Sequence, residues 1–362
     1  MMTCDQLRLL LKTGQNVEAK KFCQVVFPCV SRTFAVNVGR LPRNLSFQVL
    51  ISYLLCRIVD TIEDDPDFTP NLKAELLAEF ASLLTKPEWR ERLQPVQQAF
   101  ASRDHANNEV LLLQHCHYVL ECFNGFAEPV RIHIAHWVTE LALGMKQYAL
   151  RKPEDSKAVT FLNSIADLEE YCYYVAGTVG HLLTGLFRQC YPCIDEARYR
   201  QLEAKASSFG IGLQLTNIIK DSVGDYQRGW CYLPTDLLAQ ANLTGAAFLE
   251  ASRRQDAQNF MYHIMERAKQ HLDDALDYSC LLPYQADKAR TFCFLPLFMA
   301  IKTLTKAAHS EQLFDVARPV KITRADVKHI LAYTYLCRWS NHLMRNWYHR
   351  VSSRFSQKRS IL

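Results

Sequence analysis

Apolar residues recur at intervals of three and four along most of the chain, and this spacing constrains the fold more than any other feature of the sequence. It is the period of an α-helix that buries one face, whereas the period of two that marks a half-buried strand is almost absent. The chain has only 12 glycines and 13 prolines among 362 residues, which is too few turn formers for a β-sandwich or barrel. We therefore predict an all-α protein. The predicted helices cover 18–36, 43–65, 70–85, 108–123, 127–150, 158–164, 167–189, 195–224, 234–240, 246–251, 254–278, 284–307 and 324–349.

No Gly/Ser-rich linker and no run of like charges divides the chain. Because 49% of the residues are hydrophobic, the sequence can fill one large core. We expect a single all-α domain over 1–344, followed by a basic, flexible tail over 345–362. The net charge of +5 is mild, and a nucleic-acid-binding protein would show a denser basic patch. An anionic small molecule or an anionic membrane surface is compatible with this charge.

The 13 cysteines do not form the pattern of a disulfide framework, because their number is odd and the first 24 residues lack the apolar core of a signal peptide. Reduced thiols in a cytoplasmic protein are the expectation. The Cys190–Cys193 pair has no second CxxC to complete a zinc site, and His115–His117 with Cys122 form only a loose cluster, so neither is favoured as a metal centre. The longest apolar runs, 49–55 and 292–301, are shorter than the roughly 20 residues needed to cross a bilayer. We therefore expect no transmembrane anchor.

The segment 45–65 is apolar nearly all round, yet its polar residues form one stripe. The stripe steps by four through Gln48, Ser52, Cys56, Asp60 and Asp64. Two aspartates at i and i+4 repel each other on a helix, and a divalent cation would relieve that repulsion because Mg²⁺ takes carboxylate oxygens as ligands. A solvated acidic helix end before Pro66 is the alternative interpretation.

A second segment repeats the pattern. Gln214, Asn217, Asp221 and Asp225 share one face of a helix that is otherwise apolar. Two independent aspartate pairs on largely apolar helices argue against ordinary solvated surface charges. Together they could hold two or three Mg²⁺ ions that bind substrate phosphates.

Cationic side chains near both pairs could complete a clamp on diphosphate oxygens. These are Arg32, Arg57 and Lys220. A third helix, 167–187, places Tyr171, Tyr174 and Thr178 on one face among several glycines. Close helix packing or close approach of a ligand would offset the cost of those glycines, and tyrosines of an ordinary core are the alternative.

Six segments together resemble the squalene synthase family, whose members join isoprenoid diphosphates head to head. They are Val30–Phe34 (VSRTF), Arg57–Asp65 (RIVDTIEDD), Tyr171–Gly180 (YCYYVAGTVG), Gln214–Asp225 (QLTNIIKDSVGD), Phe292–Pro296 (FCFLP) and Val320–Ile322 (VKI). They occur in the family's order and cover about 18–345. The resemblance implies an isoprenoid-synthase fold around a central cavity, with Mg²⁺, NADPH and two molecules of farnesyl diphosphate bound.

The resemblance also implies roles for individual residues. The metal ligands would be Asp60, Asp64, Asn217, Asp221 and Asp225. Catalytic roles would fall to the four aspartates, to Tyr171 in the first half-reaction and to Phe292 in the second. Diphosphate and prenyl groups would contact Arg32, Phe34, Tyr53, Arg57 and Lys220, and NADPH would contact Ser31, Lys321 and Arg324. The faces of Phe34, Tyr53, Tyr171 and Phe292 are also suited to stabilise carbocations.

Some residues depart from the family's pattern. Lys220 stands where arginine is frequent, which keeps the charge but loses the bidentate fork, and Thr323 interrupts the basic run that follows Ile322. The family's eukaryotic members carry a C-terminal membrane anchor, and this chain ends without one. We therefore expect a cytoplasmic enzyme, with peripheral membrane contact for product release left open.

Two alternative functions remain. A dehydrosqualene or phytoene synthase of the same fold would stop at a polyene by proton loss, without NADPH. A non-catalytic helical protein that binds prenyl diphosphates is the second. The Val320–Ile322 segment favours squalene synthase over the first, and the complete aspartate pairs with Tyr171 argue against the second.

Overall fold

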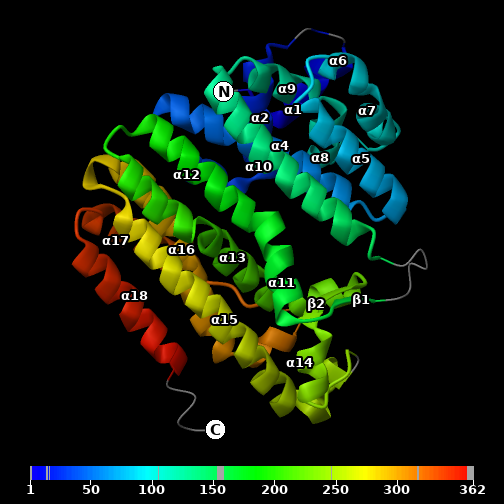
Figure 1. The fold of residues 1–362 in the computed structure, drawn as a ribbon. Coiled ribbons are helices and arrows are strands. Elements are labelled where there is room, and N and C mark those ends of the chain that lie inside the picture. Colours follow the sequence, from blue (N-terminus) through cyan, green and yellow to red (C-terminus); the bar gives the residue numbers. More distant parts are fainter. Residues whose placement is uncertain are drawn as a thin grey trace. The chain divides into compact units, whose positions relative to one another are not determined.

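The computed structural model of the protein is helical nearly throughout, which confirms the all-α prediction (Figure 1). It describes residues 2–13, 15, 17–104, 106–152, 159–245, 247–315 and 318–356. The chain groups into two compact units. Unit 1 comprises Met1–Glu154 and Gly185–Cys190, and unit 2 comprises Asp155–Thr184 and Tyr191–Leu362. The expectation of one catalytic domain over 1–344 stays a prediction.

Unit 1 is built around one long buried helix. Its helices are α1 (Cys4–Lys12), α2 (Ala19–Val30), α3 (Arg32–Val38), α4 (Arg43–Asp64), α5 (Pro70–Leu83), α6 (Trp89–Arg92), α7 (Gln94–Phe100), α8 (Asn108–Gln114), α9 (His117–Asn124) and α10 (Glu128–Ala149). The helices α2, α5, α8, α9 and α10 all pack against α4. Half of α4 is buried, including Leu54, Leu55 and Ile58, as its nearly continuous apolar sequence predicts.

Two helices predicted in unit 1 are each divided in the structure. The segment 18–36 breaks at Ser31, whose extended backbone (φ −151°, ψ 90°) ends α2 and begins α3. The segment 108–123 breaks at 115–116, between α8 and α9. The apolar spacing continues across both breaks, so it did not reveal them.

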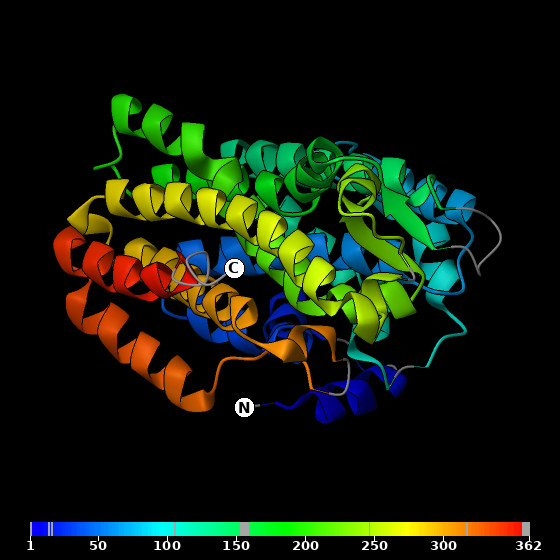
Figure 2. The same cartoon turned by 90° about the horizontal axis from the view of Figure 1, so that it is seen from below.

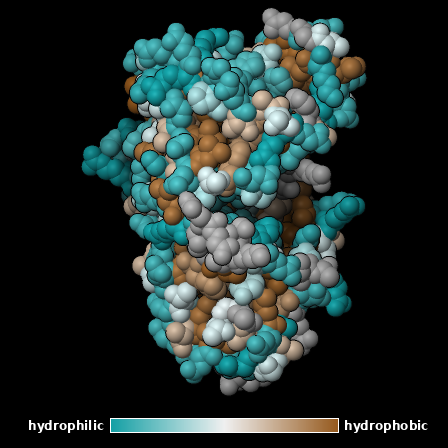
Figure 3. Space-filling view, turned by 90° about the vertical axis from the view of Figure 1, so that its right-hand side faces the viewer, coloured by the Kyte–Doolittle hydropathy of each residue, from teal (hydrophilic) through white to brown (hydrophobic). Residues whose placement is uncertain are grey.

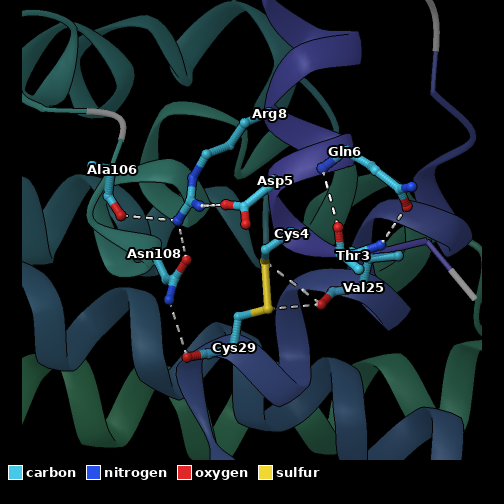
Figure 4. Close-up of a disulfide and its surroundings, with 9 residues drawn as sticks. All are labelled: Thr3, Cys4, Asp5, Gln6, Arg8, Val25, Cys29, Ala106 and Asn108. Atoms are coloured by element: carbon cyan, nitrogen blue, oxygen red, sulfur yellow. Dashed lines mark hydrogen bonds and ion pairs between the residues drawn. A yellow bond between two sulfur atoms is a disulfide. The ribbon is translucent and has the colours of Figure 1, made fainter.

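A disulfide joins the first two helices of unit 1. Cys4 of α1 is bonded to Cys29 of α2 (Figure 4). The expectation that all thiols are reduced is therefore wrong for this pair, while the other 11 cysteines are free. Beside the disulfide, Arg8 pairs with Asp5 at 2.6 Å and donates to the carbonyl oxygen of Ala106 at 2.9 Å. These contacts fasten α1 to the rest of the unit.

Unit 2 contains the longest helices. Its elements are β1 (Thr160–Leu162), α11 (Ile165–Cys172), a π-helical turn η1 (Tyr173–Gly177), α12 (Thr178–Cys190, whose last residues group with unit 1), α13 (Glu196–Gln227), β2 (Trp230–Pro234), α14 (Thr235–Gln240), α15 (Arg254–Leu281), α16 (Asp287–Ala308), α17 (Arg324–Cys337) and α18 (Asn341–Ser356). The helices α13, α15 and α16 pack against one another, and α16 also packs on α17 and α18. Figure 2 shows α17 and α18, in orange and red, as a hairpin at the edge of this group.

Several predictions for unit 2 need correction. The segment 158–164 is not a helix: β1 pairs in parallel with β2. Aromatic residues such as Phe161, Trp230 and Tyr232 fit a pleated surface well. The segment 246–251 forms 3₁₀ turns at Ala247–Leu249 and Ala251–Arg253.

The C-terminal part of the chain is more ordered than expected. The predicted helix 324–349 is two helices, and α18 continues to Ser356. A flexible tail from 345 is therefore wrong over 345–356, and 357–362 lie outside the described residues.

Glycines let two segments of unit 2 approach at backbone distance. A Cβ at Gly180 of α12 would lie 2.0 Å from the carbonyl oxygen of Ala206, and one at Gly210 would lie 2.0 Å from that of Ala176. The first of the two explanations for the glycine-rich segment 171–185, close helix packing, is thus confirmed. The helix predicted over 167–189 also contains the π-helical turn η1, a feature frequent at functional sites.

Two helices are long and apolar enough to cross a membrane by length and composition, namely Arg43–Asp64 and Tyr284–Ala308. In the structure 56% and 78% of their apolar windows are buried. Because core helices pass the same test, both are weak evidence for a membrane span. On the face shown in Figure 3, apolar side chains lie among hydrophilic ones, as is ordinary for folded proteins.

Candidate active site

The predicted site residues fall into two groups, one in each unit. The group in unit 1, which we call the α4 site, comprises Phe34, Tyr53, Arg57, Asp60 and Asp64. The group in unit 2, the α13 site, comprises Tyr171, Asn217, Lys220, Asp221 and Asp225. Each site is described within its own unit.

Asp60 and Asp64 lie on one face at the C-terminal end of α4. Asp60 is half-buried and Asp64 is exposed. Desolvation raises the pKa of Asp60 to about 7, against the opposing effect of Arg57, and the nearby Asp64 raises it further. Neither aspartate forms an ion pair with the residues that the structure describes. An uncompensated carboxylate pair of this kind is the donor set that a hard divalent cation requires.

The neighbouring acids, Glu63 and Asp65, have other interactions. Asp65 pairs with Arg103 at 2.9 Å. Glu63 is buried, desolvation raises its pKa to about 8, and the buried Lys73 donates to its backbone carbonyl oxygen. Asp60 and Asp64 form no ion pair within the described residues, although the Asp64 side chain shares a hydrogen bond with that of Glu63.

Tyr53 positions the Arg57 guanidinium, whose Nε forms no hydrogen bond with the described residues. Its Nη2 donates to the Tyr53 hydroxyl at 2.7 Å, and that hydroxyl donates to the carbonyl oxygen of Val30 at 3.2 Å. The Arg57 Nε is buried and has no hydrogen-bond partner among the described residues. Since buried donors are nearly always satisfied in native proteins, this nitrogen fits an anionic oxygen of a ligand.

An aromatic cluster lies beside Arg57. The ring centroids of Phe34 and Tyr53 are 5.1 Å apart, and Phe27 lies 5.2 Å from Tyr53. Phe27 was not predicted as a member of this cluster. Ser31 is buried at the start of α3, and the side chain of Arg32 lies outside the described part of the chain.

In the α13 site each aspartate has a cation beside it. Asp221 pairs with the adjacent Lys220, and the buried Asp225 pairs with Arg228 one turn further on. Asn217 is exposed on the same helix. Because α13 runs to Gln227 instead of ending at 224, Asp225 lies inside the helix and its spacing to Asp221 is fixed.

Tyr171 lies in a stack of three aromatic rings. Its hydroxyl donates to that of Tyr232 at 3.1 Å, and the two ring centroids are 4.8 Å apart. Trp230 stacks on Tyr232 at 5.5 Å with nearly parallel planes. Strand β2, which carries Tyr232 and Trp230, packs against both α11 and α13. The buried Tyr171 therefore belongs to the group of elements that carries Asp221 and Asp225.

The remaining predicted residues of unit 2 lie on α16 and before α17. Phe292 is buried in α16. Lys321 and Arg324 are exposed, and Lys306 donates to the carbonyl oxygen of Lys321 at 2.6 Å. Lys302 pairs with Asp326 in the first turn of α17 at 3.4 Å. Cationic side chains thus gather at the start of α17, as phosphate groups require.

The described residues contain no group of three or more His, Cys, Asp or Glu side chains arranged for a metal. Proteins usually bind Mg²⁺ through one or two carboxylates, while water and substrate phosphates supply the other ligands. The pairs Asp60/Asp64 and Asp221/Asp225 meet that requirement.

A family model for squalene/phytoene synthase matches residues 28–326 of the chain. The chain belongs to this family. The squalene synthase of Rattus norvegicus is 29% identical over 294 residues, which are 81% of this chain and 65% of the rat protein. The squalene synthase of Homo sapiens is 29% identical over 304 residues, 83% of this chain and 66% of the human protein. The chain thus spans slightly less than two thirds of the length of these two family members.

Solved structures agree with the family assignment at the level of the fold. A complex of TcSQS with the ligand E5700 superposes with a TM-score of 0.80 at 24% identity, over 95% of this chain and 92% of that chain. A dehydrosqualene synthase in complex with ligand gives a TM-score of 0.59 at 18% identity, over 90% and 97%. The predicted isoprenoid-synthase fold is confirmed.

Sequence reasoning missed several residues around the family's motifs. Tyr232, Arg228, Lys302 and Lys306 contact predicted site residues or their helices but lie outside the matching segments. Only the alternation around Trp230–Tyr232, large residues two apart, gave a signal in the sequence.

Proposed function

We propose that this chain is a squalene synthase, which condenses two farnesyl diphosphates head to head to presqualene diphosphate and reduces that product to squalene. The proposal rests on the squalene synthases among its relatives and on the residues of both sites. The observation that carries it is the α13 site, where the Tyr171 hydroxyl and two aspartates lie on elements packed together. A protein that only binds prenyl diphosphates has no need of a buried phenol on an element packed against the helix that carries its carboxylates.

We infer that Asp60 with Asp64, and Asp221 with Asp225 and Asn217, hold Mg²⁺. When bound, the metal neutralises charge on a departing diphosphate. The carboxylates of the α4 site, which form no ion pair within the described residues, and the buried Arg57 Nε support this role. Arg32, Arg57 and Lys220 would bind diphosphate oxygens and stabilise the charge that develops on them.

The aromatic residues have a separate role in the proposed reaction. Loss of diphosphate leaves an allylic cation, which water would quench, so the residues around it must be apolar. The faces of Phe34, Tyr53 and Phe292 are suited to stabilise such a cation. The Tyr171 hydroxyl, held by Tyr232 at 3.1 Å, would help to remove the proton whose loss closes the cyclopropane ring.

The reductive half of the reaction needs NADPH, which supplies the hydride that ends it. We propose that Lys321 and Arg324 contact its phosphates, with Ser31 as a further contact from unit 1. The exposed cations at the start of α17, together with Lys302 and Lys306, support this assignment.

We also propose a cytoplasmic location with peripheral membrane contact. The substrates carry charged diphosphates, whereas squalene is a hydrocarbon and dissolves in a bilayer. An enzyme that contacts the membrane surface could release this product directly into it.

Release of diphosphate from farnesyl diphosphate tests whether the chain is an enzyme at all. We expect release in the presence of Mg²⁺ and none after chelation with EDTA, with activity restored by added Mg²⁺. A chain that binds farnesyl diphosphate tightly but releases no diphosphate at saturating Mg²⁺ would be the non-catalytic binding protein, and the proposal would fail.

A further inference from the structure

An exposed apolar face runs along α17 into the turn before α18 and onto α18. Tyr335, Leu336, Trp339 and Leu343 are 58%, 74%, 52% and 43% exposed. Together with the exposed Lys328, they form what we call the hairpin face. On α17, residues 328, 332, 335 and 336 follow one side of the helix. A gathered patch of exposed apolar side chains marks an interaction site.

The exposure does not come from a frayed end, because the turn is anchored. Arg290 of α16 is fully buried. It donates to the carbonyl oxygen of Arg338 at 3.0 Å and to the Asn341 Oδ1 at 2.5 Å, while the Asn341 side chain donates to the carbonyl oxygen of Cys280 at 3.1 Å. Figure 2 shows the turn beside the end of α15 and the start of α16.

The aromatic side chains of the face are also held in place. The Arg338 guanidinium lies 4.2 Å from the ring centroid of Tyr335 and 4.9 Å from that of Trp339. Asp287 pairs with Arg338 at 3.3 Å. The rings are therefore presented to solvent in a fixed arrangement.

The charge of this part of the chain is one-sided. Residues 327–362 contain seven Lys or Arg and no Asp or Glu, so the net charge of +5 for the chain leaves −2 for the first 326 residues. Asp287 and Asp277, on neighbouring helices, pair with Arg338 and Arg345. Lys328, Arg350 and Arg354 are exposed and form no ion pair within the described ranges.

We propose that the hairpin face binds the surface of an anionic membrane, with Trp339, Tyr335 and Leu336 at headgroup level and the exposed cations against the lipid phosphates. This inference rests on the membrane contact in the proposed function and assigns it to particular residues. Trp and Tyr are enriched at the membrane interface, and clustered Lys and Arg are attracted to anionic lipid. A second copy of the chain fits less well, because a two-fold contact would bring two copies of the hairpin face together, and none of the residues that form this face is acidic.

Sedimentation of the full chain with lipid vesicles tests the proposal. The vesicles are phosphatidylcholine alone or phosphatidylcholine mixed with phosphatidylglycerol. We expect binding to the mixed vesicles that weakens with salt. Leu336→Ser with Trp339→Ser should weaken it by about tenfold or more. Ile132→Ser, which removes a comparably exposed side chain from α10, is the matched control and should bind like the wild type.

A second double variant keeps the proposal testable if the Leu336/Trp339 variant does not fold. Lys328→Glu with Arg350→Glu keeps every apolar residue and should remove the preference for anionic vesicles. Wild type that stays in the supernatant, or either double variant binding as wild type does, would overturn the proposal. So would a wild-type dimer in analytical ultracentrifugation that the Leu336/Trp339 variant loses. Diphosphate release, measured without vesicles, should be unchanged in both variants, so failure of the membrane proposal is distinguishable from failure of the enzymatic one.

Discussion

Residues 60–65 of α4 show how differently neighbouring acids can be used. Asp65 pairs with Arg103, whereas Asp60 and Asp64 have no ion-pair partner among the described residues. Asp60→Asn removes one charge from a repulsive pair. We therefore expect diphosphate release to fall by about 10²-fold or more, while the free energy of unfolding of the metal-free protein is unchanged or slightly raised. Asp221→Asn should lower diphosphate release to a similar extent, although it also removes the ion pair of Asp221 with Lys220.

Asp65→Asn is the matched control for this prediction. It changes the same residue type at the same helix end, where Asp65 pairs with Arg103 and accepts a hydrogen bond from the backbone N–H of Asp67, so diphosphate release should persist. Full activity of Asp60→Asn or Asp221→Asn at saturating Mg²⁺ would contradict the assignment of metal ligands.

Tyr171→Phe deletes the hydroxyl that Tyr232 holds and keeps the ring. If the phenol takes part in ring closure, consumption of farnesyl diphosphate should fall by roughly 10²-fold or more. Tyr262→Phe is the control, because it also deletes one hydrogen-bonding hydroxyl from a stacked ring of unit 2. Normal turnover by Tyr171→Phe would make Tyr171 an ordinary core residue.

At this scale, the aspartate pairs could be found from the sequence because both members lie on one helix, at i and i+4. Tyr232 could not be found, because its contact with Tyr171 spans 61 positions of the chain. The ion pair of Arg228 with Asp225 could not be predicted either, because it depends on α13 continuing past 224, where the predicted helix ended.

At the scale of elements, the contact of α12 with α13 depends on glycine. A Cβ at Gly180 would meet the backbone of Ala206 at 2.0 Å, while a Cβ at Gly224 would meet nothing within 4 Å. We predict that Gly180→Ala lowers the free energy of unfolding by about 1–3 kcal/mol, the range for overpacking. Gly224→Ala should instead raise it by up to about 1 kcal/mol, since alanine favours the helix. Urea unfolding of both variants checks the prediction, and equal stabilities would contradict the close approach of the two helices.

A charged contact joins α11 to α15 and gives unit 2 a dependence on pH. The hydrogen bond with His271 and the ion pair with Arg267 at 2.5 Å hold the pKa of Glu169 below its ordinary value of 4.5. Because the folded pKa is lowered, this contribution is present above about pH 4.5 and is lost as pH falls through the folded pKa.

Glu169→Gln should therefore cost about 1 kcal/mol at neutral pH, and the difference from wild type should shrink as the solution is acidified. Glu250→Gln, at an exposed acid of the same unit, is the control. Denaturant unfolding over a series of pH values measures the difference, and a cost that stays constant to the lowest pH would contradict the assignment.

Long helices could be predicted from the sequence more accurately than short strands and breaks between helices. Helices α4, α10 and α13 were predicted to within about three residues at each end, because their apolar periodicity extends over many turns. The strand β1 was read as a helix, since a three-residue strand is too short to display its period. The break between α17 and α18 depends on tertiary contacts, namely those of Arg290 with Arg338 and Asn341.

At the scale of the whole molecule, the family assignment and the two aspartate sites lead to one chemical question, which is the product of the reaction. Squalene synthases and dehydrosqualene synthases share the fold, so the fold cannot distinguish them. The exposed cations at the start of α17 are the feature of this chain that favours a reductive enzyme.

The most direct measurement is the product profile of the purified chain with farnesyl diphosphate and Mg²⁺ across a titration with NADPH. We predict squalene in proportion to NADPH, with the cyclopropyl diphosphate or its breakdown products replacing it when NADPH is absent. Lys321→Ala with Arg324→Ala should shift the titration to higher NADPH concentrations without blocking the first condensation. If the wild-type chain instead makes the same polyene at every NADPH concentration, it is a dehydrosqualene-type enzyme and the proposed reduction to squalene is wrong.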